Sequence, residues 1–348
     1  VMHAAKALAS IGFENQDNLI QITRLLIELL SLGTKDGQTR AVQVLQTIRA
    51  ENPSSHQTIA DAGEPEPVVD LLKAGIPEAK DYALWSLSLS ICGPNQGVVA
   101  SAGGVTPLIK QLDDYRVRNR EEAAAALAKL AHNNDDTRSQ ITKEGGSKPL
   151  IRQLVPGPSS SELVRQNAAA ALADLAVDTV ARDEIVGMGG IRPLVLLLED
   201  DGHHTKKFVS MALARLAKEH EATQTAIAEA GAIAPLVALL DGKEGLDAQE
   251  EAAGALFALA DHERNRLGIT EADGIGWLVM LLGCPNPRSR EHAEGALVRL
   301  SIETSNRVQI IKKLVDMLQD SGNAAQEQAA AALANLARES EDNRKTIV

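Results

Sequence analysis

A repeated phrase with a period near 42 residues constrains the fold of this chain more than any other feature of its sequence. In its clearest copy, Ala102-Gly103-Gly104-Val105-Thr106-Pro107-Leu108, two glycines are followed by a proline and a leucine. The proline, or a tryptophan in its place, recurs at positions 67, 107, 149, 193, 235 and 277, at intervals of 40, 42, 44, 42 and 42 residues. A fixed period of this length is typical of proteins whose structural units stack on one another.

A second phrase, Ala-Leu-x-x-Leu, recurs with the same period but out of step with the first. Two independent markers that share one period make a chance origin of the repeat improbable. The first leucine of the second phrase falls at Leu84, Leu127, Leu172, Leu213, Leu256, Leu297 and Leu333, with weaker copies at Leu8 and Leu45.

The copy from Thr223 to Ala260 shows what one unit is expected to contain. A short helix over 225–230 should end at Gly231, because glycine adopts the left-handed conformation that ends a helix. Pro235 is expected to open a second helix, where its missing N–H costs nothing. After a polar loop over 241–245, alanine and leucine at three- and four-residue spacing predict a third helix over 248–260. None of these helices is long enough to be stable alone, so neighbouring units must stack.

Two units depart from this pattern. The segments 18–30 and 308–313 lack the glycine and proline that separate the first two helices elsewhere. We expect those two helices to be fused or straightened at both places, and sequence drift without a structural change is the alternative. Two loops before third helices, over 156–162 and 241–246, are longer than the others, and their proline, glycine and serine content predicts turns.

A three-helix unit with glycine and proline between its first and second helices resembles the armadillo repeat, and the resemblance extends over essentially all 348 residues. It implies an all-α fold, a right-handed armadillo α-solenoid of about eight to nine three-helix repeats. Residues 1–348 are therefore expected to form a single solenoid. Because both ends fall part-way through a repeat, we expect a fragment of a longer protein with partial repeats at both ends.

Composition and charge restrict the partners. A net charge of -12 argues against nucleic acid, which requires a basic face, and 2% aromatic residues argue against base stacking. Cys92 and Cys284 form no disulfide framework and suit a reducing compartment, so a cytoplasmic location is expected, with the nucleus as an alternative. No apolar run is long enough to cross a bilayer, so direct membrane insertion is not expected, although an anchor outside this sequence is compatible.

The sequence contains no set of residues that predicts catalysis, a cofactor or a bound metal. His203-His204 beside Asp200-Asp201 lack a metal-ligand spacing and are expected in a solvated loop. Asp261-His262-Glu263 is interpreted in the same way, as a polar connection between units. Gly187-Met188-Gly189-Gly190 lacks the spacing of a phosphate-binding loop, and the repeat already explains its glycines. We therefore expect a protein that is not an enzyme.

The resemblance implies that the third helices line a concave groove in which the family commonly binds extended peptides. Nuclear-import adaptors of this family carry a tryptophan two residues before the first leucine of the second phrase and an asparagine two residues after it. Only Asn335 matches that ladder, so a nuclear-transport type of cargo receptor is the weaker hypothesis. The residues at the tryptophan place are Lys6, Gln43, Tyr82, Ala125, Ala170, Met211, Gly254, Gly295 and Ala331. Trp85 is one residue off the ladder and is expected to turn into the core.

Basic residues recur at the asparagine place instead. Lys129, Arg215 and Arg299 fall in alternate units, with Asp174 between the first two, and they resemble groove residues by which catenin-like members hold acidic, extended partners. The alternative is that they are ordinary solvated helix positions. One turn earlier on the same face lie Arg40, Glu122, Asn167, Phe208, Glu251, His292 and Gln328, of which Phe208 is either an anchor for a partner or buried against the next unit.

These observations predict a scaffold or adaptor that binds an extended or helical segment of another protein in the groove. The predicted partner-binding residues are Glu122, Lys129, Asn167, Asp174, Phe208, Arg215, Arg299 and Asn335. Catenin-like adaptors, vacuole-tethering proteins and the substrate-binding part of U-box ubiquitin ligases are all compatible with this interpretation. The alternative to a scaffold or transport receptor is a structural solenoid that forms a homo-oligomer through its end repeats.

Overall fold

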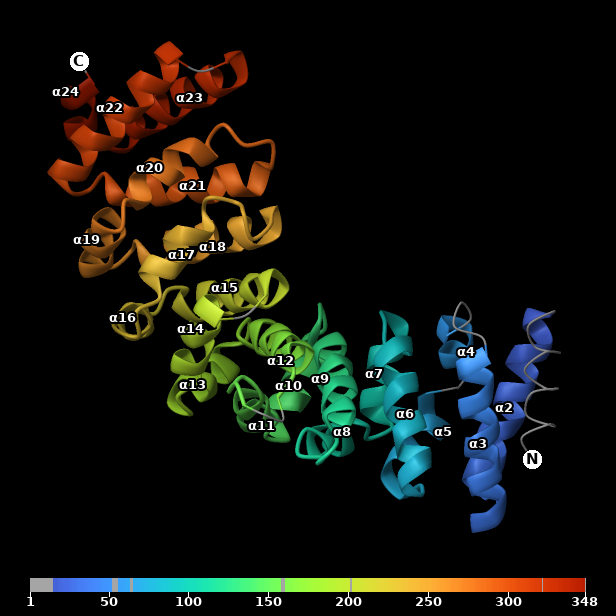
Figure 1. Cartoon of the computed structure of the whole chain (residues 1–348). Coiled ribbons are helices and arrows are strands. Elements are labelled where there is room, and N and C mark those ends of the chain that lie inside the picture. The colour runs from blue at the N-terminus through green and yellow to red at the C-terminus, as the bar shows by residue number, and fades with distance from the viewer. Residues whose placement is uncertain are drawn as a thin grey trace. The chain divides into compact units, whose positions relative to one another are not determined.

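The chain is a series of helices joined by short turns. The computed structural model describes residues 15–51, 56–62, 65–157, 160–200, 202–320 and 322–347, and no strand occurs in these ranges (Figure 1). The chain divides into two compact units, Val1–Ala181 (unit 1) and Arg182–Val348 (unit 2). The predicted all-α armadillo solenoid is confirmed by this helix pattern.

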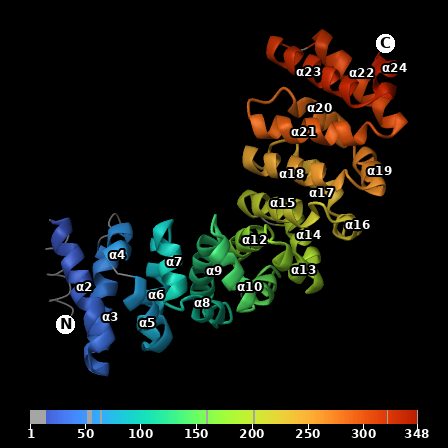
Figure 2. The same ribbon diagram turned by 180° about the vertical axis from the view of Figure 1, so that it is seen from behind.

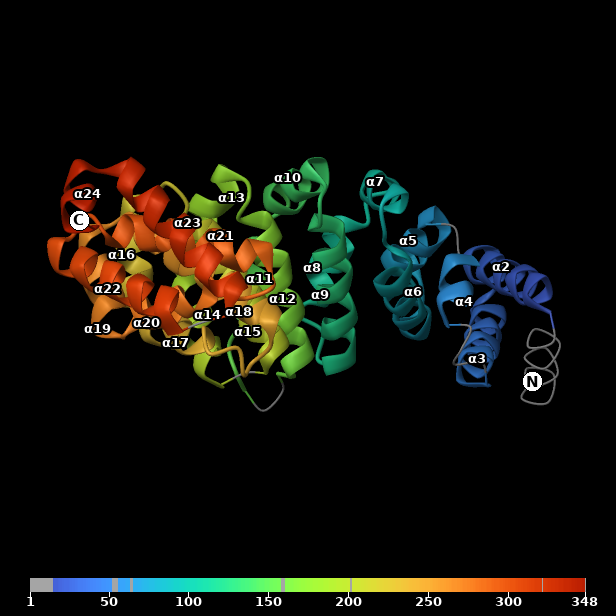
Figure 3. The same cartoon turned by 90° about the horizontal axis from the view of Figure 1, so that it is seen from above.

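Unit 1 begins with two long helices and continues with three-helix repeats. Its third helices are α3, α6, α9 and α12, and consecutive ones pack against each other. Figure 3 shows the first helices α7 and α10 along one edge of this unit. The helices are α2 (Gln16–Leu32), α3 (Lys35–Glu51), α4 (His56–Ala62), α5 (Pro65–Ala74), α6 (Pro77–Ser90), α7 (Pro94–Ser101), α8 (Val105–Gln111), α9 (Val117–Ala131), α10 (Asp135–Lys143), α11 (Ser147–Gln153) and α12 (Glu162–Leu175).

Unit 2 repeats the order of two short helices and one long helix as far as α21, and two long helices, α22 and α23, follow. Its third helices are α15, α18, α21 and α23, and each packs against the next (Figure 2). The boundary with unit 1 falls within α13. The helices are α13 (Thr179–Gly187), α14 (Ile191–Asp200), α15 (His203–Ala217), α16 (Glu221–Glu229), α17 (Ile233–Leu239), α18 (Leu246–Leu259), α19 (Glu263–Glu271), α20 (Gly274–Leu281), α21 (Pro287–Leu300), α22 (Thr304–Asp320), α23 (Asn323–Glu339) and α24 (Glu341–Ile347).

Small and branched aliphatic side chains make the core of each unit. In the repeat of α16 to α18, Leu236 of the second helix and Leu256 and Leu259 of the third are 0% exposed. Ala252 and Ala255 are also fully buried, and their short side chains let neighbouring third helices approach closely. The near absence of aromatic residues therefore reflects a core filled by closely packed helix backbones.

A glycine turn ends most of the first helices, as the sequence predicts. Gly145 has φ +75°, and its N–H donates to the carbonyl of Thr142, while Gly146 N–H donates to the carbonyl of Ile141. This pair of bonds satisfies the last carbonyls of the helix and requires a left-handed residue. Asp273, with φ +59°, occupies the same position in the repeat of α19 to α21.

The predicted start of the second helix is wrong by two residues. Pro235 is the third residue of α17, which begins at Ile233, and is not its first. The proline is tolerated there because the N–H groups of the whole first turn lack partners within the helix. The first and third helices of this repeat also begin earlier than predicted, because α16 starts at Glu221 and α18 starts at Leu246.

The two units that lack the glycine and proline contain continuous helices. Each of α2 and α22 is a single helix of 17 residues. The predicted fusion of first and second helices is therefore confirmed at both places. Nothing in either segment can adopt a left-handed turn cheaply, so the helical hydrogen bonds continue.

The described helices are short or polar relative to the apolar thickness of a bilayer. None of them is both long enough and apolar enough to cross a membrane alone. The helices α16 and α17 satisfy the length and composition only when they are taken together, and they are bent by 83° at their junction.

The glycine turn gives the first prediction. Replacing Gly231, which has φ +89°, by alanine should lower the free energy of unfolding by roughly 1 kcal/mol, because a Cβ is strained in this conformation. Urea denaturation followed by circular dichroism measures the change. Gly187→Ala is the matched control: Gly187 ends α13, its φ is not positive, and an added Cβ meets no atom within 4 Å. Equal effects of the two substitutions would contradict the argument.

Candidate functional site

The third-helix face of each unit is the candidate site. In unit 1 it consists of the side chains that α3, α6, α9 and α12 direct away from the core, and in unit 2 of those from α15, α18, α21 and α23. Figure 3 shows α15, α18 and α21 stacked on one another, in agreement with their contacts. The two faces are described separately.

In unit 1, Glu122 of α9 lies at the centre of a charged cluster. Its carboxylate accepts a hydrogen bond from Ser88 of α6 and lies 3.8 Å from Nε of Arg118. Burial raises the pKa of Glu122, while the hydrogen bond from Ser88 and the charges of Arg118 and Arg49 oppose this increase. We call Arg49, Arg118, Glu122 and Lys129 the Glu122 cluster.

Two cations of this cluster, Arg49 and Lys129, are partly buried, whereas Arg118 is exposed. Lys129 Nζ donates to the carbonyl of Leu89 at 3.2 Å, and burial lowers the pKa of Lys129. Burial also lowers the pKa of Arg49, and the like charge of Arg118 lowers it further. The guanidinium of Arg49 lies 5.0 Å from the centre of the Trp85 ring. Trp85 is only 5% exposed, so the prediction that it turns into the core is confirmed.

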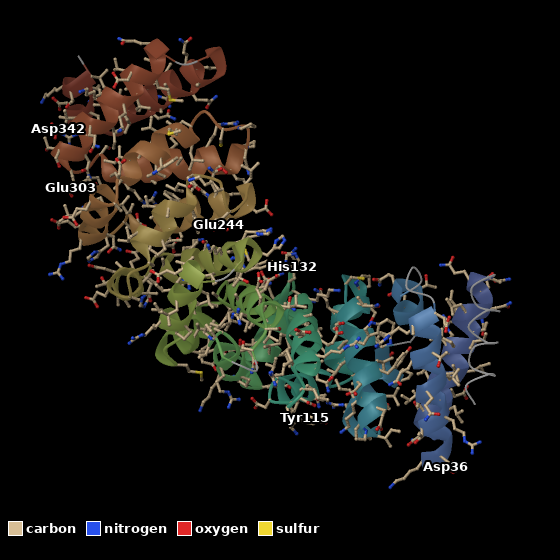
Figure 4. The ribbon with its side chains drawn as sticks, in the orientation of Figure 1. Asp36, Tyr115, His132, Glu244, Glu303 and Asp342 are labelled. Atoms are coloured by element: carbon tan, nitrogen blue, oxygen red, sulfur yellow. The ribbon has the colours of Figure 1, made fainter. Side chains whose placement is uncertain are left out.

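Asp174 and Asn167 lie on α12 of the same face. Asp174 is only 7% exposed, and its carboxylate lies 3.0 Å from Nδ1 of His132, which is labelled in Figure 4. Asn167 donates to the carbonyl of Glu121 at 3.5 Å. Both side chains therefore connect α12 to the repeat of α9, and a role for them in partner binding stays a prediction.

In unit 2, an aromatic ring lies between two cationic or basic side chains. The guanidinium of Arg299 lies 3.7 Å from the centre of the Phe257 ring and donates to Asp261. The ring of His292 stacks on Phe257 with centres 6.3 Å apart and planes 21° apart. Arg299, a predicted site residue, is thus held by contacts within the chain, whereas Phe257 is absent from the predicted site.

Two glycines make room for this cluster. A Cβ on Gly295 of α21 would lie 2.5 Å from the Phe257 ring, and a Cβ on Gly254 of α18 would lie 3.0 Å from the His292 ring. Each helix therefore receives a ring from its neighbour at its own glycine, a reciprocal contact between α18 and α21. The signal in the sequence is the pair of glycines at the place where import adaptors carry tryptophan.

The other predicted site residues of unit 2 are Phe208, Arg215 and Asn335, and each has its own neighbours. Phe208 is half-buried, with the amine of Lys207 at 5.5 Å from its ring centre. Arg215 lies close enough to Glu251 to oppose the rise in the pKa of Glu251 that burial and Glu250 cause. Asn335 donates to Glu294 and accepts from Arg338 at 2.6 Å. The structure gives each of Arg215 and Asn335 a neighbour within the chain.

The two polar segments considered in the sequence lie at ends of helices. His203 and His204 are the first two residues of α15, so the predicted loop is wrong, although both side chains are exposed as expected. Asp261 and His262 connect α18 to α19, as predicted. His262 lies 3.5 Å from Glu221, which belongs to the preceding repeat.

The glycine at position 295 gives the second prediction. Gly295→Ala should lower the free energy of unfolding by about 1 to 3 kcal/mol, because the new methyl group overlaps the Phe257 ring. The same substitution in a Phe257→Ala background should be neutral or stabilising, since alanine favours a helix more than glycine does. Thermal and urea denaturation of the four proteins in this cycle measure the coupling. Equal costs in both backgrounds would refute the contact.

The buried carboxylate of the Glu122 cluster gives the third prediction. A folded-state pKa above the ordinary value means that Glu122 lowers stability as pH rises through its titration. Glu122→Gln, which can still accept from Ser88, should therefore be more stable than the natural chain at neutral pH. The difference should shrink as pH falls through the raised folded-state pKa of Glu122. It should be lost below about 4, where the carboxyl group is protonated in both folded and unfolded states.

Melting temperatures across this pH range measure the effect. Glu66→Gln is the control, since Glu66 is exposed on α5 and no ion pair is found for it among the described residues. A Glu122→Gln protein that is less stable than the natural chain at neutral pH would show that Arg118 and Ser88 outweigh the cost of burial.

One repeat of unit 2 matches a family model. The model is described as the armadillo/beta-catenin-like repeat, and it matches residues 220–261, which contain α16, α17 and α18.

Several curated proteins are similar in sequence to part of this chain. Protein CELLULOSE SYNTHASE INTERACTIVE 3 of Arabidopsis thaliana is 26% identical over 260 residues, which are 70% of this chain and 12% of that protein. Vacuolar protein 8 of Schizosaccharomyces pombe is 31% identical over 205 residues, which are 57% of this chain and 37% of that protein. The chain thus spans much less than two thirds of the length of these relatives.

Solved structures share the arrangement of helices over all or about two thirds of this chain. The crystal structure of an engineered protein is 30% identical with a TM-score of 0.79, and the match covers 99% of this chain and 87% of that one. A designed armadillo repeat protein in complex with the peptide (KR)4 is 28% identical with a TM-score of 0.60, over 68% of this chain and 100% of that one. Together with the glycine turns and the stacked third helices, these similarities show that the chain belongs to the armadillo-repeat family.

Proposed function

We propose that this chain is a non-catalytic scaffold that binds an extended, acidic segment of a partner protein on the third-helix face of unit 1. The observation that carries the proposal is the Glu122 cluster, in which Arg49, Arg118 and Lys129 lie within electrostatic reach of the Glu122 carboxylate. These three cations gather on one face of a chain with a net charge of -12, and the carboxylates of Asp61, Asp81 and Glu121 also act on members of the cluster. Cations gathered on one face produce a local positive electrostatic potential that attracts anionic groups even when the whole molecule is acidic.

The state of the cations supports an acidic partner. The pKa values of Arg49 and Lys129 are lowered by burial, so both cations have lost part of their hydration. Carboxylates from a partner would replace the lost water with charge-assisted hydrogen bonds. They would also reduce the repulsion between Arg49 and Arg118.

The stacking of third helices supports an extended segment. Adjacent packed helices are about 8–10 Å apart, and three residues of an extended chain span a similar distance. The backbone of a segment that crosses α3, α6 and α9 therefore passes one helix about every three residues, and acidic side chains at every second residue all face the helices. The designed relative that forms a complex with (KR)4 is a precedent for peptide binding on an armadillo array, with a peptide of the opposite charge.

The fourth prediction tests this proposal with the two tryptophans of the chain, Trp85 and Trp277. Trp277→Phe leaves Trp85, beside Arg49, as the only indole. The probe is an alternating Glu-Ser peptide of about ten residues, long enough to cross four third helices. We expect its addition to change Trp85 emission, and the binding to weaken as salt is raised.

Charge reversal locates the binding. Arg118→Glu/Lys129→Glu should weaken binding of the acidic peptide at least about tenfold. The matched control, Lys110→Glu/Arg152→Glu, makes the same change in charge on α8 and α11, the second helices of the same unit. Equal loss in both variants, or stronger binding of a Lys-Arg peptide than of the acidic one, would contradict the proposal. The second result would favour a transport-receptor type of function.

A further inference from the structure

The second helices α17 and α20 of unit 2 carry an uncharged outer surface that the second helices of unit 1 lack. Three residues after the recurring proline or tryptophan, unit 1 has charged side chains, at Asp70, Lys110 and Arg152. The same position in unit 2 holds Leu196 of α14, Ala238 of α17 and Met280 of α20. The helices α17 and α20 contain no charged residue at all.

This row of apolar side chains is exposed. Met280 is 65% exposed and Leu196 is 48% exposed, and Ala238 is exposed between them in the order of the repeats. The helices α17 and α20 are neighbours, since a Cβ on Gly274 would lie 3.2 Å from Val237. Single exposed apolar residues are ordinary on a protein surface, whereas a continuous apolar row marks a contact surface. We call Leu196, Ala238, Trp277 and Met280 the second-helix stripe.

A pocket lies at the end of the stripe. It has a volume of about 700 Å³ between α20, α22 and the start of α23, and its apolar wall includes Trp277, Met280 and Met317. Gly283 borders it, and a Cβ there would lie 3.2 Å from the end of the Met317 side chain. Methionine adapts its shape to different partners, so these walls suit a large apolar side chain from outside.

The border of the stripe is acidic. Asp273 and Asp316 have exposed side chains, and neither forms an ion pair within the described ranges. Asp273 and Asp316 also line the pocket, together with the amine of Lys313. At the pocket, two carboxylates face one amine, so this end of the stripe complements positive charge.

We infer that the second-helix stripe binds an amphipathic helix of a partner protein, whose apolar face is flanked by lysine or arginine. Stacked repeats place one apolar side chain about every 8–10 Å along the stripe. An α-helix presents residues i and i+7 on one face at a spacing of about 10.5 Å, which matches this distance. A β-strand of three residues covers the same distance but directs its successive anchors to opposite faces.

The acidic border also distinguishes a protein helix from a lipid surface. Membranes that recruit peripheral proteins through charge present anionic headgroups. The carboxylates of Asp273 and Asp316 beside the pocket would repel such a surface. A helix with basic flanks satisfies both the apolar row and its border, so it is the occupant that the chemistry selects.

The fifth prediction uses Trp277 as the reporter. Trp85→Phe leaves Trp277, in the wall of the pocket, as the only indole, and removes any signal from the third-helix face of unit 1. The probe is a peptide of three heptads, about 21 residues, with leucine and one phenylalanine on one face and lysine on the other. We expect saturable binding that changes Trp277 emission. A scrambled peptide of the same composition should bind at least about tenfold more weakly.

Paired substitutions test the location without changing the charge. Ala238→Gln/Met280→Gln should weaken binding at least about tenfold. The control, Leu246→Gln/Leu267→Gln, removes two exposed leucines from α18 and α19 and should leave binding unchanged. Circular dichroism of each variant verifies that the helices remain folded.

Three results would overturn the inference. The first is equal binding of the amphipathic and scrambled peptides, which would indicate attraction to the acidic chain as a whole. The second is an affinity that the Ala238→Gln/Met280→Gln change leaves unaltered. The third is a Met280-dependent change of Trp277 emission on vesicles of phosphatidylserine and phosphatidylcholine, which would assign the stripe to a membrane surface.

Discussion

The close approach of neighbouring third helices is the constraint on which the rest of each unit depends. No helix of the array is stable alone, so every repeat must bury its long helix against the next one. Fully buried alanines such as Ala126 and Ala255 allow this approach. Where the side chains at the crossing shrink further, to Gly254 and Gly295, rings from the facing helix enter the space. The same closeness thus creates the core and determines which side chains can occupy the outer face.

Within unit 2, polar and apolar groups are separated between two surfaces. The third helices carry Arg215, Glu251 and Arg299, whose charges have partners in the chain. The second helices α17 and α20 carry no charge, and α22 adds a continuous helix beside them. In unit 1 the second helices are charged instead, so the distinction is not a general property of the repeat. We therefore attribute to the two surfaces different kinds of partner.

Much of the fold could be predicted from the sequence, because glycine, proline and alanine restrict the backbone directly. The two fused helices follow from missing turn residues, and the burial of Trp85 follows from its position beside the first leucine of the second phrase. The candidate site was harder to predict from the sequence than the fold. Whether Phe257 at the same position stays in the core depends on the residue opposite, Gly295, which is 38 positions away in the chain. The burial of Asp174 likewise depends on a contact with His132 of another repeat.

The reciprocal contact between α18 and α21 has a consequence for the modularity of the array. Most repeats of a solenoid can in principle be exchanged, duplicated or deleted one at a time, since each needs only a generic neighbour. Here the ring of Phe257 and the hollow at Gly295 belong to successive repeats, as do His292 and Gly254. If the two repeats were separated, the rings of Phe257 and His292 would lose their contacts with the facing helix, and the space beside Gly254 and Gly295 would be empty. The repeats of α16–α18 and α19–α21 should therefore be kept together when the array is shortened or its repeats are exchanged.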